Sequence, residues 1–120
     1  MDEDTKVGDL KSQVRRFCDA RDWDRYHSAK DLAIGIITES SEILEHFRFK
    51  SPEEIEGMFG NPKKREEIED EIADVLFFVL RLAQKYNIDL SRALKRKIEK
   101  NEKKYPVEVS RGSNKKYNEC

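Results

Sequence analysis

Acidic residues recur at one-turn spacing in the otherwise apolar stretch Thr38-Glu39-Ser40-Ser41-Glu42-Ile43-Leu44-Glu45-His46-Phe47. A second stretch, Glu71-Ile72-Ala73-Asp74-Val75-Leu76, repeats this arrangement farther along the chain. Carboxylates at positions i and i+3 share one face of a helix, so two such helices packed together would bring four carboxylates to one site. Carboxylates among aliphatic residues need a positive partner, and one metal ion can serve several of them. We therefore expect two packed helices that share a metal site.

Spacing alone does not establish this site, because the chain is rich in acids and pairs such as Glu53/Glu56 and Glu99/Glu102 share the spacing. The two pairs of interest differ in having apolar or small neighbours. An all-oxygen ligand set suits Mg²⁺ or Mn²⁺. The alternative is a set of ion pairs with lysine and arginine. A di-iron centre would need Glu-x-x-His, but the residue three before His46 is Ile43, so we discount iron.

Composition favours a small helical domain. A chain of 120 residues suffices for one domain, and its five glycines and three prolines are few beside abundant Glu, Lys, Leu and Ile. Charged residues make up 41% of the chain, yet 24 Lys and Arg nearly balance 25 Asp and Glu. A dedicated nucleic-acid binder would show a basic excess, so we expect no nucleic-acid partner.

Nothing in the sequence indicates export or membrane insertion. The start, Met1-Asp2-Glu3-Asp4, is acidic where a targeting segment would be basic. The longest apolar run, Val75 to Leu80, is too short to cross a bilayer. Cys18 and Cys120 have no metal-type spacing and fit a reducing compartment. We expect a soluble cytoplasmic protein with no membrane partner.

The pattern of caps and apolar positions predicts four long helices and one short one. These are a helix from Asp4 or Thr5, one from Ser28 to about Phe49, a short one from Ser51 to Gly57–Gly60, one from Asn61-Pro62 to about Asn87, and one from Ile88–Ser91 to Pro106. They form a single all-α four-helix domain over residues 1–106. Residues 107–120 form a basic C-terminal arm or tail.

Periodicity also predicts which faces are buried. The core face of the second helix is Ala33, Ile36, Ile37, Leu44 and Phe47, with Gly35, Glu39, Glu42 and His46 on an adjoining face. Because this helix is apolar around much of its circumference, we expect it to pack against a partner subunit as well. The core stripe of the third long helix comprises Ile68, Ile72, Val75, Leu76, Val79, Leu82 and Ala83.

Two other groups of residues could have either a functional role or a purely structural one. The connection from Arg21 to His27 carries Trp23, which either plugs the end of the bundle or contacts a ligand. On the last long helix, Lys97, Asn101 and Lys104 fall on one face. They form either a solvated surface or a grip for the far end of a metal-bound polyphosphate.

With these residues in view, the chain resembles the MazG-like all-α nucleoside triphosphate pyrophosphohydrolases, in particular the dCTP pyrophosphatase branch. The resemblance runs from Phe17 to about Tyr117. It is carried by Glu39/Glu42 followed by Glu71/Asp74, and by Arg21-Asp22-Trp23, His27, Lys30, Leu32, Ile88-Asp89-Leu90, Lys97 to Asn101, Lys104-Tyr105-Pro106 and Gly112 to Tyr117.

The resemblance implies a function. Mg²⁺ held by Glu39, Glu42, Glu71 and Asp74 would bind a nucleoside triphosphate, and water would attack between the α- and β-phosphates to release the monophosphate and pyrophosphate. Glu39 would also orient or deprotonate that water. The substrate would be dCTP or a modified relative, in house-cleaning of the nucleotide pool. The enzyme would be a homodimer or a tetramer made of two dimers. Substrate-binding positions would be Trp23, His27, Lys30, Phe49, Phe78, Lys97, Asn101, Lys104 and Tyr105.

Three departures from the family pattern concern the base. Asp31 stands where asparagine is usual, Phe49 where tryptophan is typical and Phe78 where tyrosine is common. Phenylalanine keeps a stacking face but loses the polar handle. These changes leave the hydrolytic chemistry intact and leave the preferred base open. Two further functions stay open beside the enzyme: a non-catalytic nucleotide or metal sensor, and a helical interaction protein.

Overall fold

The computed structural model describes residues 1–114, which contain helices and no strand, so the predicted all-α class is confirmed. Residues 115–120, the end of the predicted tail, lie outside the described residues. The elements are α1 (Val7–Ala20), the 3₁₀ turn η1 (Asp24–Tyr26), α2 (Ala29–Phe47), α3 (Pro52–Gly60), α4 (Pro62–Lys85), α5 (Leu90–Lys104) and the short α6 (Val107–Ser110).

Four helices begin where the sequence predicts, because each has a side chain that accepts a backbone N–H of the first turn. The Ser28 hydroxyl caps α2, Ser51 caps α3, Asn61 caps α4 and Asp89 caps α5. These caps are local contacts, since each joins atoms two or three residues apart.

The predicted start of α1 at Asp4 or Thr5 is wrong. The backbone N–H groups of both residues donate to the Met1 carbonyl at 3.1 and 2.9 Å, so they belong to a turn before the helix. The helix begins after Lys6, whose backbone N–H donates to the Asp9 carboxylate at 3.1 Å. Similarly, α2 ends at Phe47 and not at Phe49, whose φ of 62° is incompatible with a right-handed helix.

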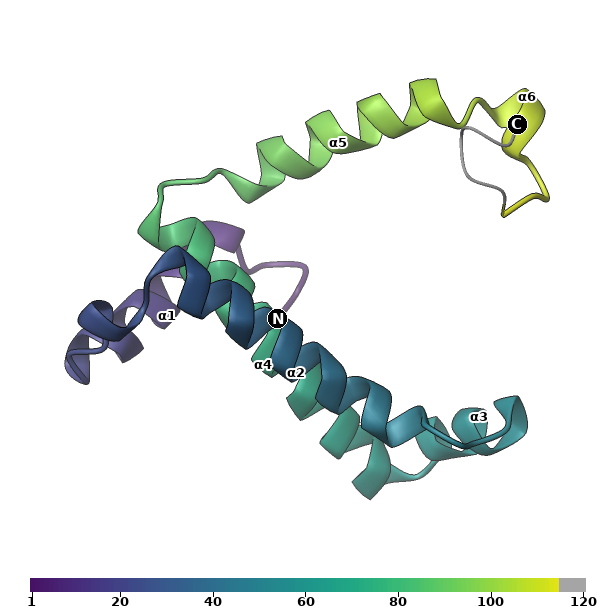
Figure 1. Cartoon of the computed structure of the whole chain (residues 1–120), viewed down its shortest axis with the longest axis horizontal. Helices are drawn as coiled ribbons and strands as arrows, with labels where there is room; N and C mark the ends of the chain where they lie inside the picture. Colours follow the sequence, from purple (N-terminus) through teal and green to yellow (C-terminus); the bar gives the residue numbers. More distant parts are fainter. Residues whose placement is uncertain (115–120) are drawn as a thin grey trace. The chain divides into compact units, whose positions relative to one another are not determined.

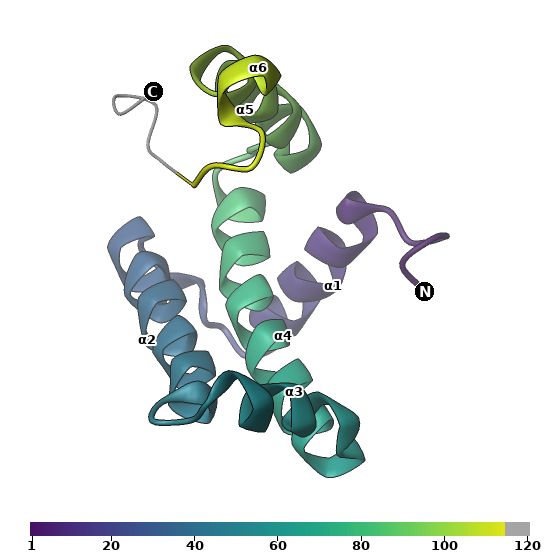
Figure 2. The same ribbon diagram turned by 90° about the vertical axis from the view of Figure 1, so that its right-hand side faces the viewer.

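The chain divides into two compact units after Asn87. In the first unit, α4 is the central helix and contacts α1, α2 and α3. Helices α2 and α4 run side by side and antiparallel (Figure 1), and α1 and α2 flank α4 on opposite sides (Figure 2). The buried apolar side chains of this unit are Val14, Cys18, Leu32, Ile68, Leu80 and Ala83.

The buried face of α2 differs from the prediction. Leu32 is buried, and Ile36 and Phe47 are half-buried, but Ile37 is 71% exposed and Leu44 is 61% exposed. Ala33 is exposed too. The helix has two apolar faces. Helix α4 covers the face that also bears Gly35 and the acidic residues. Glycine at this position lets the two helices approach closely.

On α4, Ile68 and Ala83 are buried as predicted, whereas Ile72 and Leu76 are 50% and 44% exposed. The stripe that faces the neighbouring helices instead includes Leu80 and, unexpectedly, Arg81. The reason is that α4 packs against α1 near its C-terminal end as well as against α2, so the buried surface is not one straight stripe.

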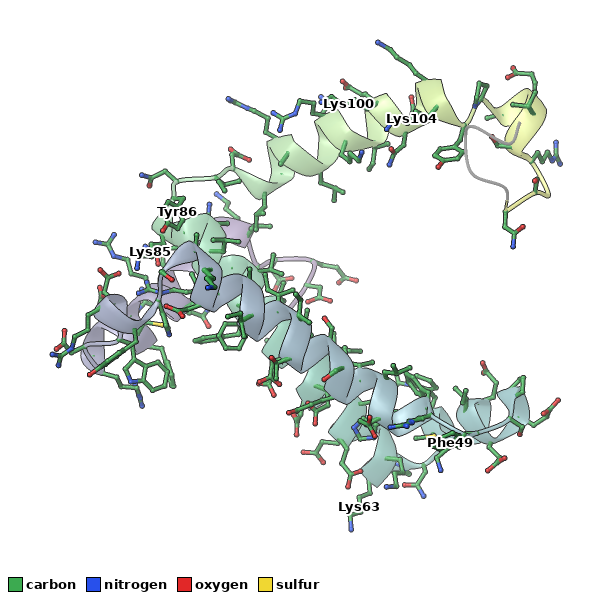
Figure 3. The ribbon with its side chains drawn as sticks, viewed as in Figure 1. Phe49, Lys63, Lys85, Tyr86, Lys100 and Lys104 are labelled. Carbon is green, nitrogen blue, oxygen red and sulfur yellow. The ribbon has the colours of Figure 1, made fainter. Side chains whose placement is uncertain are left out.

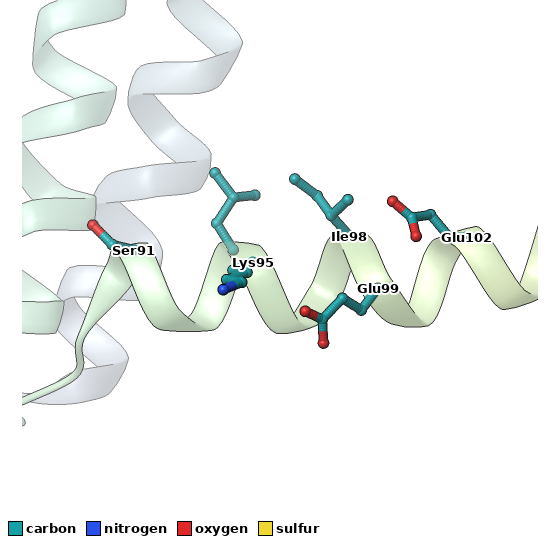
Figure 4. A pocket seen from close by; sticks show the side chains of 6 residues that line it. Ser91, Lys95, Ile98, Glu99 and Glu102 are labelled. Carbon is teal, nitrogen blue, oxygen red and sulfur yellow. The ribbon is translucent and has the colours of Figure 1, made fainter.

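The second unit contains α5 and α6. On α5, Leu94 is 62% exposed and Ile98 is 48% exposed. They line a shallow groove along this helix together with Ser91, Lys95, Glu99 and Glu102 (Figure 4). Across residues 1–114, no helix is both long enough and apolar enough to cross a membrane.

Candidate functional site

Two helices of the first unit place four carboxylates together. Glu39 and Glu42 lie one turn apart on α2, and Glu71 and Asp74 lie one turn apart on α4. One oxygen from each residue lies within 4.8 Å of the corresponding oxygens of the other three. Glu39 and Glu71 are half-buried, while Glu42 and Asp74 are exposed, so the cluster opens to solvent on one side.

The crowding of these groups disfavours their negative charge. A hydrogen bond shared with Glu42 is the largest cause that raises the pKa of Glu71 from 4.5 to about 7, followed by burial and by the charges of Glu42, Asp74 and Glu39. Burial, then the charges of Glu42 and Asp74, raises the pKa of Glu39. Without a cation, the cluster therefore binds a proton more readily than four separate carboxylates would.

The surroundings supply little compensation for this charge. Within residues 1–114, no lysine or arginine forms an ion pair with any of the four carboxylates, and Oε2 of Glu71 is buried without a hydrogen-bond partner. The nearest positive candidate is His46, whose Nε2 lies 3.9 Å from Oε1 of Glu71. An all-carboxylate set with an unpartnered buried oxygen fits a hard divalent cation and disfavours the alternative of lysine and arginine ion pairs.

Three of the predicted substrate-binding residues belong to one row of contacting rings. This aromatic row comprises, in order, His27, Trp23, Phe17, Phe77 and Phe78. Trp23 and His27 flank η1, with ring centroids 5.8 Å apart. Edge-on contacts continue from Trp23 to Phe17 at 5.6 Å, from Phe17 to Phe77 at 5.7 Å, and from Phe77 to Phe78 at 5.6 Å. The sequence alone assigned neither Phe17 nor Phe77 to the site.

Phe78 also fixes the spacing of α2 and α4. A Cβ atom added to Gly35 would lie 2.7 Å from Cδ1 and Cε1 of the Phe78 ring. The ring therefore packs directly on the backbone of α2, one turn before Glu39. Through this contact, the residue at position 35 determines both the place of the ring and the approach of the two helices that carry the acids.

Sequence reasoning missed a polar network beside the aromatic row. Arg81 is 1% exposed, and its guanidinium donates to Nδ1 of His27 at 3.0 Å, to Oδ1 of Asp24 at 3.1 Å and to Oε1 of Gln84 at 2.6 Å. One feature of the sequence does indicate that Arg81 is buried. Arg81 directly follows the apolar run Val75 to Leu80, and the predicted core stripe continues with Leu82 and Ala83.

Lys85 (Figure 3) completes this network from the last turn of α4. Its ammonium donates to the backbone carbonyl of Asp24 at 2.9 Å and to that of His27, and it lies 3.5 Å from Oδ1 of Asp24. Two cations from α4 thus hold the η1 segment against this helix.

Other predicted residues lie apart from this arrangement. Phe49 is 91% exposed in the connection between α2 and α3 (Figure 3), where the Arg48 guanidinium lies 4.7 Å from its ring centroid. Lys30 is exposed in the first turn of α2. Asp31 has a local role, because its carboxylate accepts from the Ser28 backbone at 3.2 Å and the Ser28 hydroxyl at 2.7 Å, and these bonds lower its pKa.

Four of the predicted substrate-binding residues belong to the second unit. Lys97, Asn101 and Lys104 lie on α5, where Figure 3 labels Lys104, and Tyr105 is the C-cap of this helix. Asn101 is half-buried and the other three are exposed. Their part in the site stays a prediction.

The sequence and the fold together define the class. Residues 34–120 match the MazG-like family, and the chain belongs to this family. The fold is similar to that of a pyrophosphatase from Archaeoglobus fulgidus, with a TM-score of 0.77 and 40% sequence identity over 83% of this chain and 92% of that one. The match to the family includes both acidic pairs.

The chain is also similar to relatives that are named dCTP pyrophosphatase 1. The chain is 35% identical over 109 residues to dCTP pyrophosphatase 1 of Rattus norvegicus, covering 91% of this chain and 64% of the relative. It is 30% identical over 111 residues to dCTP pyrophosphatase 1 of Homo sapiens, covering 92% and 65%. The chain thus spans a little less than two thirds of the length of these relatives.

Proposed function

We propose that this protein is a Mg²⁺-dependent nucleoside triphosphate pyrophosphohydrolase, which cleaves between the α- and β-phosphates to yield a nucleoside monophosphate and pyrophosphate. The convergence of four carboxylates within 4.8 Å is the observation that carries this proposal. The similarity to a pyrophosphatase over most of both chains and to dCTP pyrophosphatases supports the reaction class.

Glu39, Glu42, Glu71 and Asp74 would hold Mg²⁺, with Mn²⁺ as a substitute, because hard cations prefer carboxylate oxygens. A bound Mg²⁺ supplies charge neutralisation for the triphosphate and lowers the pKa of water. The four carboxylates would hold the ion from two helices, so its place would depend on the approach of α2 to α4.

Glu39 is our choice for the group that orients the attacking water and accepts its proton. It is half-buried, and burial followed by the charges of Glu42 and Asp74 raises its pKa above the usual value. Its place one turn after Gly35, where Phe78 packs, puts it beside the aromatic row.

The aromatic row suits the nucleoside half of the substrate, and we propose dCTP or a modified dCTP-like nucleotide in line with the named relatives. Trp23, His27 and Phe78 offer faces and edges for a base and a sugar. Lys97, Asn101 and Lys104 would bind phosphates, and Phe49 would contact the nucleoside. Lys30 and Tyr105 are further proposed substrate-binding residues.

We further propose a homodimer or a tetramer of two dimers, acting in the cytoplasm in house-cleaning of the nucleotide pool. The exposed apolar residues of the first unit support association, since Ile34, Ile37 and Leu44 on α2 are 51%, 71% and 61% exposed. These positions at i, i+3 and i+10 fall on one side of the helix and form a stripe that a second subunit would cover.

A panel of canonical and modified triphosphates, assayed with and without Mg²⁺ for pyrophosphate and monophosphate, tests the activity. We expect both products in equal amounts, with EDTA abolishing turnover. Release of inorganic phosphate in place of pyrophosphate would contradict the proposed bond cleavage. Tight binding of nucleotides with no turnover across the panel would instead indicate a sensor, and insensitivity of the melting temperature to Mg²⁺ and all nucleotides would indicate a structural role.

A further inference from the structure

Arg81 is the only charged side chain that is fully buried within residues 1–114. A buried guanidinium is costly unless its N–H groups are hydrogen-bonded. Here Nε, Nη1 and Nη2 each have one side-chain acceptor, on His27, Gln84 and Asp24 respectively. Two of these acceptors lie in or next to η1, more than 50 positions away along the chain, so the arginine joins α4 to that segment.

The bond to His27 determines the protonation pattern of the imidazole. A guanidinium only donates and stays charged, so Nδ1 of His27 must be the acceptor in the 3.0 Å bond from Nε of Arg81. In a neutral imidazole with an unprotonated Nδ1, the proton is on Nε2. Burial is the main cause that lowers the pKa of His27, and the charges of Arg81 and Lys85 lower it further, against smaller opposing effects of Asp24 and Asp31.

Lys85 anchors the same segment in a different way. Its ammonium contacts the backbone carbonyls of Asp24 and His27 and the carboxylate of Asp24, and it makes no hydrogen bond to the imidazole. The position of the segment therefore depends on both cations, whereas the tautomer of the ring depends on Arg81.

We propose that Arg81 is a positioning residue that fixes His27 as the Nε2–H tautomer, so that His27 offers a hydrogen-bond donor to an acceptor atom on the nucleoside half of the substrate. This inference rests on the proposed function, in which His27 contacts the nucleotide. The packing of the His27 ring against Trp23 at 5.8 Å places it in the aromatic row, which suits a base or sugar. A neutral N–H donor matches a carbonyl or sugar oxygen.

A donor fixed in this way also provides selectivity. A base that presents an N–H group at the same place would leave two donors facing each other and lose the hydrogen bond. Sites that hydrogen-bond a substrate group discriminate strongly against an analogue that cannot pair with it. The substrate class is thus a nucleotide with an acceptor atom at the position that meets His27.

The tautomer can be measured in the nucleotide-free protein by long-range ¹H–¹⁵N NMR correlation of the imidazole nitrogens. The chain has two histidines, so a His46→Gln variant assigns the signals. We expect the Nε2 of His27 to have the shift of a protonated nitrogen and Nδ1 that of an unprotonated one at neutral pH. The opposite pattern in the wild-type protein would overturn the proposal without any variant of Arg81.

Steady-state kinetics of Arg81→Met and Lys85→Met then separate the tautomer from the anchoring of the segment. For Arg81→Met we expect mixed tautomers of His27 and a KM for the nucleotide about threefold to tenfold higher, with a smaller change in kcat, as for the loss of one hydrogen bond. Lys85→Met should keep the Nε2–H tautomer. Equal tautomer changes in the two variants would show that Arg81 only holds the segment and would overturn the proposal.

Inorganic tripolyphosphate, used as a competitive inhibitor, distinguishes the nucleoside half from the phosphates. Its inhibition constant should be unchanged in Arg81→Met, because it has no base or sugar. A matching rise in that constant would place the His27 contact on the phosphates and refute the assignment to the nucleoside. If the wild-type protein hydrolyses no triphosphate, the proposed function fails, whereas the NMR result still decides the tautomer.

Discussion

Replacing Gly35 with alanine tests the contact that sets the spacing of the two acid-bearing helices. The new Cβ would lie 2.7 Å from two ring atoms of Phe78, about 1 Å closer than carbon atoms prefer. Overpacking of this kind costs roughly 1–3 kcal/mol. Alanine is favoured over glycine inside a helix by about 1 kcal/mol. The net expectation for Gly35→Ala is a loss of roughly 0–2 kcal/mol in the free energy of unfolding.

Gly57→Ala is the matched control, because Gly57 lies within α3 and a Cβ there meets nothing within 4 Å. This variant should gain about 1 kcal/mol from helix propensity alone. Urea denaturation of the two variants and the wild-type protein should therefore give free energies of unfolding that differ by roughly 1–3 kcal/mol between the variants. Equal stabilisation by both alanines would refute the packing of Phe78 on α2.

Two further predictions concern charge and association. In metal-free protein, the raised pKa of Glu71 means that the folded state keeps a proton that the unfolded chain loses, so the melting temperature should fall as the pH rises from 4.5 to about 7. Glu71→Gln should flatten this pH dependence, and a slope equal to that of the wild type would contradict the assignment. Ile37→Glu places a charge on the exposed stripe of α2, and light scattering should show a smaller species than the wild type; an unchanged mass would place the interface elsewhere.

The sequence predicted what depends on contacts between near neighbours. The caps Ser28, Ser51, Asn61 and Asp89 were found because each side chain bonds to the backbone of its own first turn. The convergence of the two acidic pairs was also anticipated, since i, i+3 spacing and an apolar setting require no knowledge of register.

The sequence did not predict which apolar face of a helix is buried, nor which residues far apart along the chain form hydrogen bonds. Periodicity shows that α2 has more than one apolar face, but it does not say which face α4 covers, so Ile37 and Leu44 were wrongly assigned to the core. Arg81 received no role from the sequence, because its acceptors on His27 and Asp24 lie far away along the chain.

The central claim is that the four converging carboxylates hold the metal for hydrolysis of a nucleoside triphosphate. Initial rates of pyrophosphate release with Mg²⁺, measured for Glu42→Gln, Asp74→Asn and the control Glu45→Gln, test it most directly. Glu45 is an exposed acid on the same helix, 3.4 Å from Arg48 and outside the cluster. We predict that the first two variants lose turnover while their circular dichroism stays helical, and that the control retains it. Wild-type rates in Glu42→Gln and Asp74→Asn would contradict the account.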